Sequence, residues 1–303
     1  MSADSRLQAG VAVGQANARA ALAGNPSDGY GGAVLALALP GPRATVTARP
    51  AQSLTVDPDS ELIRAAALRL AQDHAPEAAR TELRWTTTIP RCVGLGGSSA
   101  IVIATLRALG DLYGVRLERP ELAELALAIE VEDLNIAAGL QDRVAQVYGG
   151  VTFMDFSRRP HTYESLHACE LPPLVVAWRA DAASASGGVH APLRERFERG
   201  EPTVLDALAE LGTLARGARE ALRGADHERF AHCVNASFDA RRQMLDLDPN
   251  HVEMITRARA AGASANYAGS GGAIVAVCTD ESHRERVAGS LEELGCGTLM
   301  PAL

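Results

Sequence analysis

The chain has 303 residues, 47% of them apolar, so it can bury a large core, and its length suggests about two domains. Its net charge of −8 argues against a nucleic-acid partner, because neutralising phosphates needs clustered Lys and Arg. The apolar runs are too short to span a bilayer, and residues 1–20 lack the apolar region of a signal peptide. The five cysteines are widely spaced without Cys-x-x-Cys, and the eight histidines lack ligand spacing. We therefore expect a cytoplasmic protein with no membrane partner, no disulfide framework and no zinc site.

The first elements predicted along the chain are strands at 33–39 and 44–49, separated by a turn at the Pro-Gly-Pro of residues 40–42. An amphipathic helix is expected at 59–74, and a β-rich segment follows at 82–89.

The sequence GLGGSSA then precedes a strongly apolar helix. Pro120 opens another helix through about Asp133, as proline does at a first helical position. A short helix at 140–148 ends at two glycines, and a strand is expected at 151–156.

The pattern becomes irregular and polar at 157–170, where we place a boundary between domains 1–165 and 166–303. The second half predicts strands at 173–180 and 273–278 and helices at 202–223, 226–246, 249–261 and 280–294. Mixed strands and helices with several two-strand runs favour an α+β fold in two lobes over a doubly wound parallel sheet.

The first loop that can carry chemistry consists of Gly94, Leu95, Gly96, Gly97, Ser98, Ser99 and Ala100. Its glycines let backbone N–H groups approach an anion, and its serines open a helix whose dipole favours phosphate. The alternative is a strand-to-helix turn with serine N-caps. The loop lacks the GK[ST] ending of a P-loop, and no G-x-G-x-x-G dinucleotide fingerprint is present, so a dehydrogenase is disfavoured.

Two further glycine-bearing loops flank this one in the sequence. GNPSDGYGG, at residues 24–32, contains Asn25 and Asp28, and Arg19 lies upstream among small apolar residues, where an arginine usually has a partner. YAGSGGAIVAV, at residues 267–277, contains Gly269, Ser270 and Gly271. Each loop reads either as a turn before a strand or as part of a ligand site.

Three candidate catalytic or metal-binding carboxylates lie between the second and third loops. Glu130 and Glu132 end one helix, and Asp142 begins the next, so Glu130 and Asp142 could converge without sharing a helix face. Glutamates near a helix end are more often solvated, whereas the helix of Asp142 has an apolar side.

Taken in order, the three loops resemble the three motifs of the GHMP small-molecule kinases, which include galactokinase, homoserine kinase and mevalonate kinase. ANARAALAGNPSDGYGG resembles the first motif, GLGGSSA the second and GASANYAGSGGAIVAV the third. Within the family, GNPSDGYGG, AGLQDRVAQVYGGVTFMDFS, SGGVHAPLRERF and NASFDARRQM are most similar to the plant glucuronokinases. The resemblance implies a two-lobed GHMP kinase-like fold with its active site in the cleft between the lobes.

The resemblance also implies roles for individual residues. Asp142 matches the catalytic aspartate, and Arg19 and Asp28 match residues at the sugar, where Asn25 is expected as well. Arg19 would keep Asp142 ionised and favour the charge that develops during transfer. Ser99 and Glu130 match Mg²⁺ ligands. The second loop, joined by Gly269, Ser270 and Gly271, would hold the ATP phosphates. Two departures stand out: Asn25-Pro26 replaces an acid-histidine pair, and Asn266-Tyr267-Ala268 replaces Lys-x-Thr.

The implied activity is ATP- and Mg²⁺-dependent phosphorylation of a sugar, with D-glucuronate at its anomeric hydroxyl as the expected acceptor. A uronate carboxylate calls for a local cation, and we expect it from Arg241, Arg242 or the His190 region, although a solvated helix face is the alternative for either arginine. Galactose, L-arabinose or another small acceptor, and a non-catalytic nucleotide-binding regulator, remain open. Intact Arg19, Ser99, Glu130 and Asp142 argue against the regulator.

Overall fold

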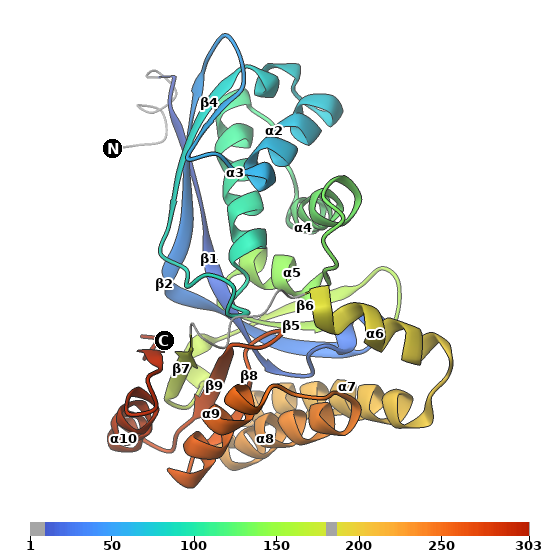
Figure 1. Ribbon diagram of the computed structural model, residues 1–303, viewed down its shortest axis with the longest axis vertical. Helices are drawn as coiled ribbons and strands as arrows, with labels where there is room; N and C mark the ends of the chain where they lie inside the picture. Colours follow the sequence, from blue (N-terminus) through green and yellow to red (C-terminus); the bar gives the residue numbers. More distant parts are fainter. Residues whose placement is uncertain (1–9, 180–186, 303) are drawn as a thin grey trace. The chain divides into compact units, whose positions relative to one another are not determined.

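The computed structural model describes residues 10–179 and 187–302, which form two compact units (Figure 1). One unit contains the described residues of Met1–Ala18, Gly41–Ile89 and Gly96–Val147. The other contains those of Arg19–Pro40, Pro90–Leu95 and Tyr148–Leu303. Helices and largely antiparallel sheets occur together, which confirms the predicted α+β class. Each of these units consists of several separate stretches of chain, whereas the predicted domains 1–165 and 166–303 are continuous. The two predicted domains therefore stay a prediction.

The first unit is built from helices packed on strands. Its helices are α2 (Glu61–Asp73), α3 (Gly97–Tyr113), α4 (Arg119–Ala128) and α5 (Gln141–Tyr148), with short turns η2 (Pro76–Ala79) and η3 (Ile129–Asp133). Its strands are β3 (Thr55–Asp57), β4 (Thr81–Thr87) and parts of β1 (Ala12–Ala23) and β2 (Ala33–Pro50). The predicted helices are present, but the one expected through Asp133 changes from α to π geometry after Ala128.

Strand β2 corrects the prediction of two strands separated by a turn. It is continuous, pairing with β5 (Val151–Asp155) through residues 33–37 and with β4 through residues 44–50. The Pro-Gly-Pro segment lies between these two paired stretches. Its missing proline N–H groups therefore remove no hydrogen bond from either ladder, and the strand continues through it.

Strand β1 and helix α3 approach each other closely at Gly14. A Cβ atom on Gly14 would lie 2.0 Å from the carbonyl oxygen of Ala104 and 2.5 Å from the backbone nitrogen of Ala108. Only glycine permits this contact, which fixes the long helix that begins at the second glycine loop.

The second unit combines two groups of strands with a set of helices. Its strands, besides the rest of β1 and β2, are β5, β6 (Thr162–Leu166), β7 (Leu174–Trp178), β8 (Ser264–Tyr267), β9 (Ala273–Val277) and β10 (Gly297–Leu299). Its helices are η1 (Ser27–Tyr30), η4 (Ala168–Glu170), α6 (Gly187–Glu198), α7 (Pro202–Arg223), α8 (His227–Met244), α9 (Pro249–Ala260) and α10 (Glu281–Glu292). Helix α7 has the predicted bounds, and α8 and α9 lie within a few residues of theirs.

Strand β6 departs from the prediction of an irregular segment at 157–170. Its residues are half-buried or exposed on both faces, so no period of two appears in the sequence. The strand forms because it pairs antiparallel with β5, from Asp155 opposite Thr162 to Val151 opposite Leu166.

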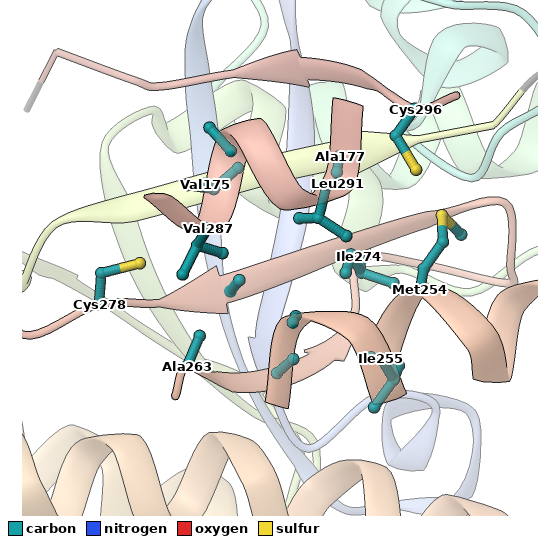
Figure 2. Close-up of a cluster of buried hydrophobic side chains, with 14 of the residues drawn as sticks. Val175, Ala177, Met254, Ile255, Ala263, Ile274, Cys278, Val287, Leu291 and Cys296 are labelled. Carbon is teal, nitrogen blue, oxygen red and sulfur yellow. The ribbon is translucent and has the colours of Figure 1, made fainter. Parts of the chain in front are cut away.

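The core of the second unit lies on the antiparallel sheet β10-β7-β9-β8. Alternate strand residues, among them Val175, Ala177 and Ile274, face apolar side chains of α9 and α10 (Figure 2). Strand β8 leads directly into the third glycine loop, so this core anchors that loop. Among the described helices, none has the length and apolar character needed to cross a membrane.

Candidate active site

The second glycine loop turns the chain into α3 through two left-handed glycines. Gly94 and Gly96 have φ of +74° and +73°, and Gly96 is the N-cap residue of the helix. The serine N-cap alternative is therefore not what the structure shows: the Ser99 hydroxyl donates to the carbonyl oxygen of Gly96 at 3.1 Å, and Ser98 lies in the first turn. The first turn of an α-helix leaves backbone N–H groups for an external acceptor, and a phosphate fits that requirement.

The second and third glycine loops are in direct contact. A Cβ atom on Gly94 would lie 2.5 Å from the carbonyl oxygen of Gly271, and one on Gly269 would lie 2.1 Å from the carbonyl oxygen of Gly94. Side chains are therefore excluded where the two loops meet, and only glycine at these positions lets the two backbones pack so closely.

Arg19 ties the same two loops together. Its side chain is only 4% exposed, and Nη1 donates to the carbonyl oxygens of Gly94 at 2.6 Å and Ala268 at 3.0 Å. The sequence predicted that this arginine has a partner, and two backbone carbonyls are among its partners. Its predicted effect on Asp142 stays a prediction.

Glu130 forms a buried ion pair that the sequence does not predict. It is 0% exposed, and its Oε2 accepts from the Nε of Arg143 at 2.8 Å and also from Nη2. Arg143 further donates to the carbonyl oxygen of Gly139 at 2.8 Å. The sequence hints at this arginine only by placing it directly after Asp142, in GLQDR.

The remaining oxygen of Glu130, Oε1, is buried and has no hydrogen-bond partner among the described residues. A buried carboxylate oxygen needs a donor or a cation, and hard oxygen ligands suit Mg²⁺. Glu130 and the Ser99 hydroxyl thus fit the expected metal in chemical type. Glu132, by contrast, is 61% exposed and pairs with Arg69 at 3.0 Å.

Asp142 lies in the first turn of α5 and is 18% exposed. Its Oδ2 is 3.8 Å from Nη1 of Arg143. A carboxylate that reaches solvent at the start of a helix can accept a proton from a bound acceptor, as a general base must.

In the first glycine loop, the two departures from the family pattern meet. The Asn266 amide donates to Oδ1 of Asn25 at 3.3 Å, and the Asn25 amide donates to the carbonyl oxygens of Tyr267 and Gly269 at 3.3 and 3.4 Å. Both asparagines are buried. Asn25 therefore joins the first and third loops, and its contact with the sugar stays a prediction. Asp28, in η1, is half-buried.

The three residues expected to bind the carboxylate of a uronate substrate occupy different environments. Arg241 is 2% exposed and donates to the carbonyl oxygens of Gly269 and Ser270 at 2.9 and 3.4 Å. Burial lowers the pKa of Arg241 to about 10, partly offset by Tyr267. Arg242 is exposed on α8. His190 belongs to α6, but its side chain lies outside what the structure describes.

Comparison of the sequence with known protein families and proteins identifies relatives of this chain. The sequence models of the "GHMP kinases N terminal domain" and "GHMP kinases C terminal" families match residues 61–150 and 218–295. Glucuronokinase 1 of Arabidopsis thaliana is 34% identical over 304 residues, covering 87% of this chain and 84% of that protein. Probable glucuronokinase 2 of the same plant is 40% identical over 65% of this chain and 57% of its own length.

A structural comparison shows the same fold. The crystal structure of Lactococcus lactis galactokinase complexed with galactose superimposes with a TM-score of 0.81, at 18% identity, over 97% of this chain and 93% of that one. Fold and sequence together define an ATP-dependent small-molecule kinase. The chain belongs to the GHMP kinase family.

Proposed function

We propose that this ATP-dependent sugar kinase phosphorylates D-glucuronate at its anomeric hydroxyl, giving glucuronate 1-phosphate and ADP. The anomeric oxygen forms a bond to the γ-phosphorus, the bond from that phosphorus to the β,γ-bridging oxygen breaks, and the hydroxyl proton leaves to a base. The observation that carries this proposal is the 34% identity to glucuronokinase 1, which extends over most of both chains.

Asp142 is the proposed base. Phosphoryl transfer needs the acceptor oxygen to be positioned and its proton removed, and the protein otherwise contributes mainly charge neutralisation. The partly exposed carboxylate of Asp142, 3.8 Å from Arg143 at the start of α5, supports that role.

Ser99 and Glu130 are the proposed ligands of Mg²⁺. When bound, the ion neutralises charge on the transferring phosphoryl group. The unpartnered, buried Oε1 of Glu130 supports this assignment, and the ion pair with Arg143 holds the carboxylate in a single orientation.

The glycine loops are proposed to hold the ATP phosphates through backbone N–H groups. Gly94 to Ala100 and Gly269 to Gly271 contribute these groups. Hydrogen bonds from Arg19 and Arg241 to backbone carbonyls of the loops hold the loops in place.

The proposed location of the protein is the cytoplasm.

A coupled assay of ADP release tests the proposal. The acceptors are D-glucuronate, D-galacturonate, D-glucose, D-galactose and L-arabinose, each with ATP and Mg²⁺. We expect the highest kcat/KM with glucuronate. Equal or better use of galactose or L-arabinose would overturn the acceptor and keep the kinase. ATP binding without turnover on any acceptor would favour the regulator.

A further inference from the structure

One arginine of α6 contacts the first glycine loop directly. The Nη2 of Arg194 donates to the carbonyl oxygen of Gly29 at 2.9 Å, and its guanidinium carbon lies 4.6 Å from the ring centre of Tyr30. Gly29 and Tyr30 immediately follow Asp28, the residue that the family pattern places at the sugar. This cation therefore lies at the proposed acceptor loop and within the same unit.

The backbone at Arg194 is held in place by the packing of two neighbouring residues of α6, Leu193 and Phe197. Leu193 is fully buried in a cluster with residues of α7 and α8, and Tyr30 and Phe197 pack against that cluster. The rings of Tyr30 and Phe197 are 4.8 Å apart. Helix α6 is thus held against η1, while Arg194 itself remains exposed to solvent.

The neighbouring arginines are either paired with a carboxylate or buried. Arg216 pairs with Asp155 at 3.1 Å, and Arg196 pairs with Glu201 at 2.5 Å. Arg241 is buried on the third loop. Among the described residues, Arg194 has no carboxylate within ion-pair distance, and its contacts are Gly29 and Tyr30.

The chain contains no lysine, so a carboxylate in the acceptor must be read by an arginine, a histidine or backbone groups. A guanidinium presents five donors in a planar fork, and one bond to Gly29 leaves a second edge that can bind a carboxylate in bidentate fashion. The Tyr30 ring and the Gly29 carbonyl pre-orient this fork, so little side-chain entropy remains to be lost on binding.

We propose that Arg194 binds the carboxylate of the sugar acid and is the residue by which this kinase selects a uronate over a neutral hexose. This inference rests on the proposed function and names the cation that it requires. It replaces Arg241 and Arg242 in that role: Arg241 is bound to the third loop, and Arg242 lies on the exposed face of α8.

The test compares glucuronate with its neutral analogue D-glucuronamide, which keeps the shape and removes the charge. We measure kcat/KM for both in the wild type, in Arg194→Met and in Arg194→Lys. The expected preference of the wild type for glucuronate is about tenfold to a hundredfold, the range for hydrogen bonds to charged groups. Arg194→Met should abolish it, leaving kcat/KM for glucuronamide and the KM for ATP nearly unchanged, whereas Arg194→Lys should retain part of it.

Arg199→Met is the matched control. Arg199 follows the same helix, is 65% exposed and pairs weakly with Glu195 at 3.9 Å, so its loss removes the same charge away from the acceptor loop. Thermal melts check whether both variants are folded. An unchanged glucuronate preference in folded Arg194→Met, or an equal loss in Arg199→Met, would overturn the inference.

Failure of the inference and failure of the proposed function give different results. A wild type that does not phosphorylate glucuronate refutes the function before any variant is made. A wild type that prefers glucuronate, with the preference intact in Arg194→Met, refutes only the role of Arg194.

Discussion

At the scale of single residues, Asp142 is the side chain on which the proposed chemistry depends most. We predict that Asp142→Asn keeps the fold and ATP binding but lowers kcat by about 10²–10⁴-fold, the usual contribution of a general base. An amide cannot take the proton, yet it has the size of the carboxylate, so packing should not change. Turnover and a thermal melt are the measurements, with Asp111→Asn, exposed on α3, as the control. Near-normal turnover in folded Asp142→Asn would contradict the role.

The two glutamates of η3 provide a second contrast at this scale. We predict that Glu130→Gln raises the Mg²⁺ concentration needed for half-maximal activity and lowers the maximum, because a neutral amide is a poorer ligand. It also removes the buried carboxylate that pairs with Arg143, which should lower the free energy of unfolding by up to about 3–5 kcal/mol.

Glu132→Gln is the matched control for that experiment. Its exposed pair with Arg69 should contribute about 1 kcal/mol or less, and the Mg²⁺ titration should not change. If Glu132→Gln shifts the titration and Glu130→Gln does not, Glu132 is the metal ligand and the assignment of Glu130 is wrong.

At the scale of elements, the contact between the second and third glycine loops is the feature to test. Gly94→Ala would force a Cβ atom to within 2.5 Å of the Gly271 carbonyl oxygen at a φ of +74°. We predict a marked rise in the KM for ATP, because the loops must separate to admit the methyl group.

Gly149→Ala separates the steric effect from the backbone strain. Gly149 has nearly the same φ, +75°, but a Cβ atom added there would meet nothing within 4 Å. Both variants should lose about 1–2 kcal/mol of stability from the left-handed backbone, and only Gly94→Ala should change the KM for ATP. Equal effects on that KM would show that the loop contact is not needed for nucleotide binding.

At the scale of the whole molecule, charge sets how stability responds to acid. Burial raises the pKa of Asp155, but hydrogen bonds with Ser157 and Arg216 outweigh this and hold it below its usual range. The pKa values of three further carboxylates are also lowered: Glu201, Glu220 and Asp280. A carboxylate whose pKa is lower in the folded state stabilises the fold above its unfolded pKa, and this contribution is lost as the pH falls through the folded value.

We therefore predict that the free energy of unfolding falls as the pH decreases below about 4, where the unfolded carboxylates take up protons first. Urea unfolding at a series of pH values measures it. Asp155→Asn should show a shallower decline than the wild type, and a free energy that stays constant on acidification would contradict the argument.

Local sequence determined the helices, the three glycine loops and the candidate chemistry. Periodicity over many residues suffices for a helix such as α7, and glycine and proline mark turns wherever they occur. Strand β6 and the continuity of β2 could not be read in this way, because pairing with a neighbouring strand decided both.

What only the tertiary structure decided is how the candidate residues are used. Nothing local distinguishes Glu130 from Glu132, yet one is buried on Arg143 and the other is exposed. Asn25 meets Asn266, and Arg194 meets Gly29, across long stretches of chain. Burial and hydrogen-bond partners arise from contacts between distant segments, so a sequence can supply the reactive groups while the fold alone determines which of them meet.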